Sequence, residues 1–322
     1  MINALDFPAV SVPGITHSAE NVTVHNRRGS TLIELLVVIA ILGVIFSILL
    51  PALSKARETA KRTSCLSNLR QISHGWHLYA DENNDVSVPG RYAKAPGGKS
   101  NPENWYEVGN GLKYRPRWMA TMGKQVGLFA FERPKTDDDR QDYDGGVYQC
   151  PVVSERLDER NHAFGYNHQF LGNARKKNGR FYNFPVNRSR IRSFAGTVLA
   201  ADCLGTAAGF PALARTEYEN NGTSYTALSN HAWSLDPPRL TETSDRGSGD
   251  ADSPRTAVDA RHDGRANVVY CDGHGASQTP TQLGYRILPG GAFVDLDEVG
   301  DPPSNQLFSG SGRNDDPPDL PK

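Results

Sequence analysis

The sequence lacks the signatures of several common functional classes. None of its four cysteines forms a C-x-x-C pair, which argues against a zinc ribbon or a dithiol redox site. The 35 basic and 36 acidic residues leave a formal net charge of −1, without the basic stripe of a general nucleic-acid binder. No G-x-S-x-G nucleophile elbow is present. We therefore expect no nucleic-acid partner, no enzymatic activity and no cofactor.

Long regular segments are also scarce. The 322 residues include 31 glycines and 21 prolines, a share that favours a loop-rich domain over a helical bundle. Hydrophobic residues make up 38% of the chain, which is enough for a sizeable folded domain. Most of the chain is therefore expected to form one domain of short elements.

One long hydrophobic run stands out against this background. Residues 35–50 read LLVVIAILGVIFSILL, and every one of them is apolar or small. With its flanks, residues 31–53, the run has about the 20 residues that a helix needs to cross a ~30 Å hydrocarbon core. A buried helix of a soluble domain would show a polar face, and this segment shows none after Glu34. The sequence thus predicts a transmembrane helix over residues 31–53.

The helical pattern continues beyond Pro51 but changes character. Apolar residues now recur at steps of four, three, four and three, which places them on one stripe of a helix: Cys65, Leu69, Ile72, Trp76 and Tyr79. We predict one helix over residues 30–83, whose second half packs on the chain's own domain. Pro51 is expected to bend it, because proline removes one helical hydrogen bond.

Strand signals are clearest near the C-terminus. Residues 266–271 form an apolar run, and Asp272-Gly273 separates it from a second short run; this pattern predicts a β-hairpin with a type I′ turn. Together with the helix it indicates an α+β fold with an antiparallel sheet. We assign residues 84–299 to the globular domain and interpret the proline-rich residues 300–322 as a disordered tail.

The segment in front of the hydrophobic run carries a specific motif. Arg28-Gly29-Ser30-Thr31-Leu32-Ile33-Glu34-Leu35, followed by an apolar helix, resembles the N-terminus of type IV prepilins and pseudopilins. The resemblance implies that residues 1–29 are a leader that prepilin peptidase removes between Gly29 and Ser30. It also implies that Ser30 is N-methylated and that Pro51 is the helix kink of many pilins. Ser30 is a departure, since the family usually has phenylalanine there.

Glu34 is the residue on which the resemblance depends most. A carboxylate at the edge of a membrane span is costly unless it is paired, so it is a functional candidate. In the family, the equivalent glutamate pairs with the terminal amine of a neighbouring subunit and sets the register between subunits. The resemblance assigns this role to Glu34; the alternative is a carboxylate that reaches the lipid headgroups.

A second resemblance involves the C-terminal half. His262, followed after nine residues by Asp272-Gly273, is similar to the H-x9-D-G motif of large prepilin-like proteins of planctomycete and verrucomicrobial type. Further stretches are similar to the same group: residues 65–72, residues 79–83, Cys150-Pro151 and residues 165–167. The resemblance implies a pilin-like fold, with a long N-terminal helix packed on the sheet, but no biochemical role for the motif.

The cysteines and acidic residues leave alternatives open. Cys203 and Cys271 both end strand-like runs and could form a disulfide, or all four thiols could be buried and free. We expect no metal site, since nothing places His262, Asp272 and His274 together. The acidic loop, with Asp137, Asp139, Asp142 and Asp144, offers oxygen ligands for calcium, which some major pseudopilins bind. Its spacing does not match an EF-hand, however, and a solvated loop is the favoured interpretation.

Two functions remain. The first is a pseudopilin-like structural subunit of the inner membrane, for example of type II secretion. Its expected partners are prepilin peptidase, other pseudopilins, the secretion machinery and the lipid bilayer. The second is a membrane-anchored binding module, for example for a glycan, that uses the aromatic residues Trp105, Tyr106, Trp118 and Trp233.

The prepilin interpretation places the globular domain outside the cytoplasm. The positive-inside rule favours the reverse, because five basic residues follow the span within 20 residues and only Arg27 and Arg28 directly precede it. We give the motif precedence, since long domains are translocated largely regardless of charge.

Overall fold

The fold was analysed in a computed structural model of the chain. The structure describes residues 31–134, 143–153, 163–172, 174–177, 180–205, 207–215, 233–241, 244, 246, 254–295 and 302–319. The chain divides into two compact units, residues 1–53 and residues 54–322. The helix α1, Leu32–Glu82, belongs to both units, with 51 residues and Pro51 inside it.

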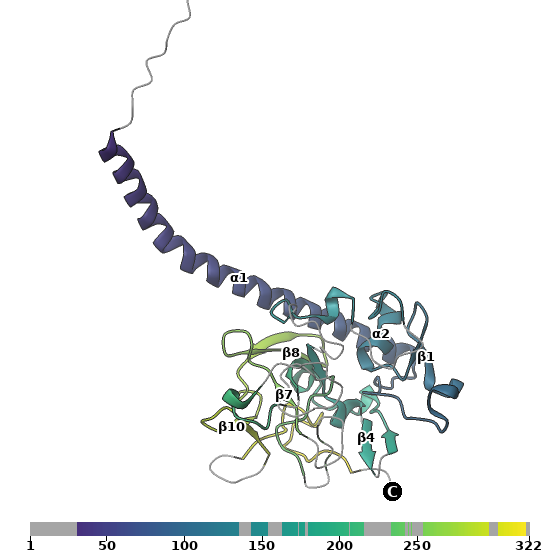
Figure 1. The fold of residues 1–322 in the computed structure, drawn as a ribbon. Helices are drawn as coiled ribbons and strands as arrows, with labels where there is room; N and C mark the ends of the chain where they lie inside the picture. The colour runs from purple at the N-terminus through teal and green to yellow at the C-terminus, as the bar shows by residue number, and fades with distance from the viewer. Residues whose placement is uncertain are drawn as a thin grey trace, which may run out of the picture. The chain divides into compact units, whose positions relative to one another are not determined.

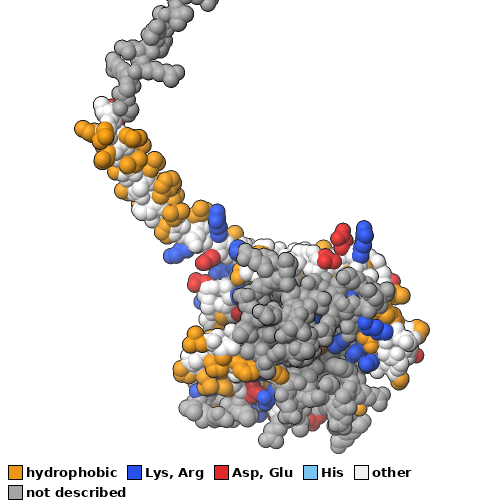
Figure 2. Space-filling view, viewed as in Figure 1, with side chains coloured by type: hydrophobic (Ala, Val, Ile, Leu, Met, Phe, Trp, Pro, Cys, Tyr) orange, Lys and Arg blue, Asp and Glu red, His pale blue; other side chains and the backbone are white. Residues whose placement is uncertain are grey.

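The described part of the first unit is the apolar portion of α1. An 18-residue window reaches a mean hydropathy of 3.0, and none of that window is buried, so this helix is long and apolar enough to be a candidate membrane span. Its large hydrophobic side chains are exposed from Leu32 to Leu53. Figure 2 shows them covering the surface of this part of the helix. Such exposure is costly in water and favourable in lipid.

The portion of α1 in the second unit has the predicted buried stripe. Cys65, Leu69, Ile72 and Trp76 are at most 2% exposed, and Tyr79 is nearly buried. The Trp76 indole donates a hydrogen bond to the Tyr166 hydroxyl, at 3.1 Å. Gly275 lies so close to the helix that a Cβ there would approach Leu66 to 2.7 Å. The second half of α1 therefore packs tightly on the globular domain.

The domain is built on a five-stranded antiparallel sheet (Figure 1). Its order is β3 (Phe164–Tyr166), β6 (Val198–Leu204), β8 (Ala266–Tyr270) and β9 (Gly275–Gln278), and β7 (Ala257–Val258) pairs with the far end of β6. The expected α+β, pilin-like arrangement of a long N-terminal apolar helix and antiparallel sheets is confirmed.

Three two-stranded sheets and one further α-helix accompany this sheet among the described residues. The helix is α2 (Trp118–Val126), and the strand pairs are β1 (Trp105–Glu107) with β2 (Leu112–Tyr114), β4 (Ala174–Lys177) with β5 (Arg180–Asn183), and β10 (Arg286–Ile287) with β11 (Phe293–Val294). Short 3₁₀ turns lie at Gly98–Ser100, Pro102–Asn104, Gly146–Tyr148, Arg188–Arg190, Phe194–Gly196 and Ala212–Ala214, and a π-turn at His168–Gly172.

The central strands have apolar side chains on both faces. Leu199 of β6 and Val269 of β8 belong to the core cluster that includes the α1 stripe. Ala201 and Val268 belong to a second cluster on the opposite face, together with Phe308. All seven residues of β6 are buried, because alternate side chains of a strand point to opposite faces.

The predicted β-hairpin is present, but its turn is of another kind. Strands β8 and β9 pair antiparallel, with Val269 opposite Gly275. A type I′ turn needs positive φ at both central residues, yet at Asp272-Gly273 only Gly273 has one, at 88°. Asp272 instead accepts a hydrogen bond from the His274 amide. The sequence has a second Asp-Gly pair before β8, and there both residues have positive φ: Asp263 at 55° and Gly264 at 72°.

The interpretation of residues 300–322 as a disordered tail was wrong for the described residues 302–319. Phe308 is fully buried and meets the Tyr285 ring edge-on, with the ring centroids 5.7 Å apart. The Leu307 carbonyl accepts a hydrogen bond from the Val198 amide at the start of β6. The composition was misleading because a few well-placed apolar residues are enough to fix a proline-rich segment.

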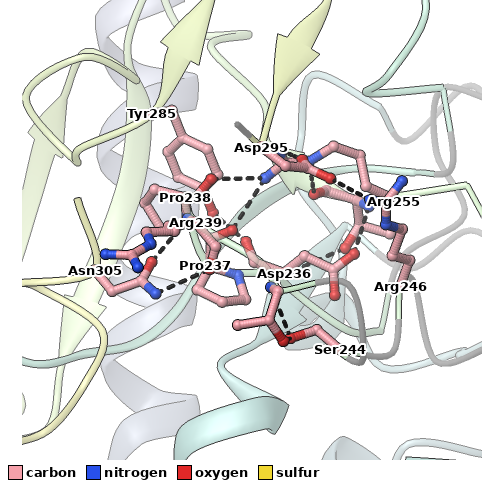
Figure 3. A network of polar contacts seen from close by, with 12 residues as sticks. Asp236, Pro237, Pro238, Arg239, Ser244, Arg246, Arg255, Tyr285, Asp295 and Asn305 are labelled. Carbon is pink, nitrogen blue, oxygen red and sulfur yellow. Dashed lines mark hydrogen bonds and ion pairs between the residues drawn. The ribbon is translucent and has the colours of Figure 1, made fainter. Parts of the chain in front are cut away.

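A polar network holds this segment in place (Figure 3). Asn305 exchanges hydrogen bonds with the backbone of Arg239: its Oδ1 accepts from the Arg239 amide and its Nδ2 donates to the Arg239 carbonyl. Near it, the Tyr285 hydroxyl donates to the Asp236 carbonyl. Arg255 forms an ion pair with Asp295. Hydrogen bonds between loops, rather than the ladder of a sheet, thus provide partners for these buried polar groups.

The burial of Phe308 gives a test of the tail's role. We expect Phe308→Ala to lower the free energy of unfolding by about 3–5 kcal/mol, because it removes a large buried ring. Leu213→Ala, at a fully exposed position, should change it by no more than about 0.5 kcal/mol. Urea titrations of the two variants in detergent, followed by tryptophan fluorescence, measure the difference. Equal midpoints for both would show that the tail does not belong to the cooperative core.

Candidate functional site

Glu34 and Thr31 form a capping arrangement at the start of α1. The Thr31 amide donates to Glu34 Oε2 at 2.9 Å, and the Glu34 amide donates to Thr31 Oγ1 at 3.3 Å. This reciprocal pair is the capping box of the pattern Thr-x-x-Glu, and it satisfies amides that have no partner within the helix. Both residues are exposed. The Glu34 carboxylate is therefore held at the helix N-terminus, where the helix dipole also favours an anion.

The predicted cleavage site, Gly29 and Ser30, lies outside the described residues. It directly precedes Thr31, so a new terminus at Ser30 would be one residue away from the cap. Pro51 lies inside α1, as predicted, and leaves the Ser47 carbonyl without its usual helical donor.

His262, the first residue of the proposed C-terminal motif, belongs to a buried cluster of four side chains. The other members are Cys65, Cys150 and Asp202, and one ligand atom of each lies within 4.8 Å of the other three. Cys65 Sγ lies 3.1 Å from Asp202 Oδ1. His262 Nε2 lies 3.3 Å from Asp202 Oδ2 and 3.5 Å from Cys150 Sγ. We call these four residues the Cys-Asp-His cluster.

Four different elements supply the cluster. Cys65 is on the buried stripe of α1, and Asp202 is in the central strand β6. Cys150 follows the 3₁₀ turn Gly146–Tyr148. His262 begins the tight turn before β8, where its backbone exchanges two hydrogen bonds with Arg265. The site is thus fixed by the packing of α1 on the sheet.

Electrostatics inside the cluster favour a separated charge. Burial raises the pKa of the Cys65 thiol far above its usual range. A hydrogen bond from Cys65 outweighs burial and lowers the pKa of Cys150 to about 5. Burial acts to lower the pKa of His262, but the hydrogen bonds to Asp202 and Cys150 raise it to about 9. The shifts of Cys150 and His262 thus both favour the charged forms, a thiolate beside an imidazolium.

The other residues of the C-terminal motif do not join His262. The Asp272 carboxylate accepts from its near neighbour His274, with Oδ1 and Nδ1 2.6 Å apart, at a partly exposed position. The His274 ring stacks on Tyr270, and Gly273 supplies the positive φ of the turn. Asp272 and Gly273 thus shape the hairpin, whereas His262 contributes to the cluster. The sequence expectation that the two histidines do not converge agrees with this placement.

The predicted disulfide between Cys203 and Cys271 was wrong. Cys203 is opposite Val258 near one end of β6, whereas the Cys271 amide bonds to Thr197, which precedes the other end. Thr197 and Cys203 are six residue steps apart along the chain, about 20 Å at 3.3 Å per residue in a strand. All four cysteines are free and buried. The error arose because both cysteines were chosen for their place at the end of an apolar run. That place does not determine which strand ends lie next to each other in the sheet.

The calcium candidates Asp137, Asp139 and Asp142 lie outside the described residues. Asp144 is described, and its carboxylate accepts a hydrogen bond from the Glu132 amide at 2.8 Å. Its observed role is to brace a loop. Calcium binding by this loop stays a prediction.

Two of the four aromatic residues of the binding-module alternative are in the core, and Trp105 and Tyr106 are partly exposed. Trp118 and Trp233 are at most 2% exposed, and the Trp118 indole donates to the Trp233 carbonyl. Tyr106 stacks on Tyr92, and the Trp105 indole donates to the Lys99 carbonyl. The buried rings of Trp118 and Trp233 offer no stacking platform to a glycan, and one face of Tyr106 is taken by Tyr92, so the structure gives this alternative little support.

Sequence reasoning missed the Cys-Asp-His cluster. Cys65 was assigned to the core stripe, and Cys150 was noted only as part of a stretch that is similar to other prepilin-like proteins. Asp202 directly follows the apolar residues 198–201, and a charge in such a place is rare unless it is paired. That anomaly was the available signal, but it could not name the partners.

Comparison with known proteins agrees with the N-terminal motif. Residues 24–50 match the family model of the prokaryotic N-terminal methylation motif. The chain has a prepilin-type N-terminus. A stretch of 79 residues is 35% identical to the type IV wide pilus major component PilA4 of Thermus thermophilus.

That match covers 24% of this chain and 60% of the relative's length. No solved structure matches the chain. The comparisons therefore bear on the N-terminal segment and the pilin-like character of the chain, while the H-x9-D-G motif stays a prediction.

The positions of the cysteines lead to a first chemical test of the site region. After unfolding in denaturant with an alkylating agent and no reductant, non-reducing peptide mapping should recover Cys203 and Cys271 as separate, alkylated peptides. A linked peptide pair Cys203–Cys271 would contradict the strand register reported above.

Proposed function

We propose that the chain is a pilin-like structural subunit that is anchored in the inner membrane by residues 31–53. It is processed by prepilin peptidase between Gly29 and Ser30, N-methylated at Ser30, and assembled with other pilin-like subunits. The observation that carries the proposal is the matched methylation motif at residues 24–50, joined to an apolar helix whose side chains are exposed throughout. A type II secretion pseudopilus is the assembly we favour.

The geometry at Glu34 supports a register role. Its carboxylate is exposed at the helix N-terminus and is bound to the backbone of Thr31 only three residues away. Removal of the leader would leave a terminal ammonium at Ser30. In lipid, a carboxylate on one helix and an amine on the next would satisfy each other, because neither can find water. The capping box holds the carboxylate until such a neighbour arrives.

The proposal places the second unit in the periplasm. Its loop-rich surface and near-zero net charge suit an extracytoplasmic domain, and the basic residues after the span, among them Lys55, Arg57 and Lys61, then face the outer leaflet. These basic residues hinder export only slightly, since translocation of a long domain depends little on such charges.

Processing can be tested at the new N-terminus. In cells with an active prepilin peptidase, intact mass and N-terminal sequencing of membrane-extracted protein should show a chain that starts at methylated Ser30. Gly29→Val should block the cut, because the peptidase reads the glycine. A wild-type chain that still begins at Met1 under these conditions would reject the proposal.

The role of Glu34 can be separated from that of its cap. We expect Glu34→Ala to leave membrane insertion intact and to reduce incorporation into the polymer at least about tenfold, the effect of losing roughly 1.4 kcal/mol per contact. Thr31→Ala is the matched control: it removes the hydroxyl that caps the Glu34 amide but keeps the carboxylate, at a helix cost of about 0.5–2 kcal/mol.

Pulldown of tagged subunits from sheared polymer, normalised to the amount in the membrane, measures both variants. Normal incorporation of Thr31→Ala beside loss in Glu34→Ala supports the register role. Equal loss in both would assign Glu34 to helix capping alone.

A further inference from the structure

The Cys-Asp-His cluster has the composition of a metal site that the proposed function does not require. It offers two sulfur atoms, one imidazole nitrogen and one carboxylate oxygen from residues far apart in the chain, all turned to one point. We propose that Cys65, Cys150, Asp202 and His262 bind one zinc ion in a closed, tetrahedral, structural site. The site lies wholly in the unit of residues 54–322 and is independent of the assembly role.

The choice of metal follows from the donor atoms. Calcium and magnesium take oxygen ligands almost exclusively, so two cysteines and a histidine exclude them. Thiolate and imidazole suit zinc, which is tetrahedral in structural sites and needs no open position. Four protein ligands complete its coordination, so the site is structural rather than catalytic.

The spacing of the donor atoms is close to what zinc requires. Bonds of about 2.0–2.3 Å to a tetrahedral centre put the donor atoms roughly 3.3–3.8 Å apart. The separations are 3.1 Å for Cys65 Sγ to Asp202 Oδ1, 3.3 Å for Asp202 Oδ2 to His262 Nε2, and 3.5 Å for His262 Nε2 to Cys150 Sγ. Tetrahedral binding would use one Asp202 oxygen for both contacts, and donor pairs that lie up to 4.8 Å apart would have to close by about 1 Å.

The surrounding groups hold the ligands in position. The Asn267 amide donates to Asp202 Oδ2 at 2.8 Å, and the Asn267 side chain donates to the Arg62 carbonyl of α1 at 3.0 Å. Three of the four ligands are fully buried and His262 is 5% exposed. Such outer contacts orient ligands and are a regular part of metal sites.

The charge balance also fits. Two thiolates and one carboxylate carry three negative charges, so a bound zinc ion leaves a net charge of −1. The Arg261 side chain, 6% exposed, is in the same buried region and interacts electrostatically with Asp202 and with both thiols. Its guanidinium also pairs with Asp259 at 2.9 Å. With Asp259 counted as well, the four anionic groups, the zinc ion and the Arg261 guanidinium leave a net charge of −1, compared with −3 without the metal.

An opening leads to the site from the surface. A cavity of about 470 Å³ is bordered by His262 and by its neighbours Arg261 and Asp263. Its remaining lining consists of Lys55, Glu58, Thr59, Lys61, Arg62 and Val152. Cys65, Cys150 and Asp202 do not border this cavity and the His262 side chain is only 2% exposed, so an entering ion would reach the site past His262.

A disulfide between Cys65 and Cys150 is the competing explanation. It would account for two of the four residues, and an exported domain permits it. It would leave unexplained why a buried carboxylate and a buried imidazole converge on the same sulfur atoms. Zinc accounts for all four side chains.

The test uses the full chain in detergent, stripped of metal with a chelator under reducing conditions and then equilibrated with zinc. After gel filtration, elemental analysis should find one zinc per chain. Cobalt in place of zinc should give the visible absorption of a tetrahedral centre and a sulfur-to-cobalt charge-transfer band. Zinc should also raise the melting temperature of the wild-type chain.

Cys65→Ser and Cys150→Ser should weaken zinc binding at least about 100-fold, since even changes outside the ligand shell cost about 10–100-fold. Cys271→Ser is the matched control: Cys271 is equally buried and free but is not a member of the cluster. It should bind zinc and give the cobalt spectrum like the wild type. Asp202→Asn and His262→Gln keep side-chain shape and should lose the zinc-dependent rise in melting temperature even if a cysteine variant fails to fold.

A zinc content far below one ion per wild-type chain would overturn the proposal. So would cobalt spectra without sulfur charge transfer, or variants of the cluster that bind as tightly as Cys271→Ser. A Cys65–Cys150 disulfide in metal-free protein isolated from membranes without reductant would overturn it in favour of the competing explanation.

Discussion

The packing of the second half of α1 against the antiparallel sheet is the contact on which the rest of the structure depends. The helix covers one face of β6 and β8 with a stripe that ends in the Trp76–Tyr166 hydrogen bond. Burial of a Leu, Ile or aromatic side chain contributes about 1.5–3 kcal/mol, so four or five of them form a large share of a domain's stability. The same contact brings Cys65 to Asp202, and so the Cys-Asp-His cluster exists only while helix and sheet are joined.

Features set by neighbouring residues could be predicted from the sequence, and features set by distant ones could not. The apolar run, the stripe with its helical spacing and the β8–β9 hairpin follow from local periodicity. The Cys-Asp-His cluster combines four elements over almost 200 positions, and no spacing rule connects them. The disulfide failed for the same reason, because apolar runs do not state which strand ends adjoin. The prediction of a disordered tail failed because it was based on average composition. It gave no weight to the single residue Phe308, which the core buries.

Under the proposed function, Glu34 would serve two purposes in succession. Within a single chain it completes a capping box with Thr31, which satisfies amides at the helix start. In an assembly, the same carboxylate would face an amine from the adjacent chain. The strength of the cap, about 0.5–2 kcal/mol, is small enough for a buried charge pair to displace it. A carboxylate held by strong hydrogen bonds within its own chain could not pair with the next subunit, whereas a weakly held one could.

The contact between Leu307 and the first residue of β6 has a consequence for biosynthesis. The Val198 amide and the Phe308 pocket stay unfilled until the ribosome has made residues that lie more than 100 positions downstream. The helix is therefore available to a membrane long before the domain behind it can close. Two events are therefore separated in time during synthesis. The apolar helix is available first, and the domain can complete its fold only after nearly the whole chain has been synthesised.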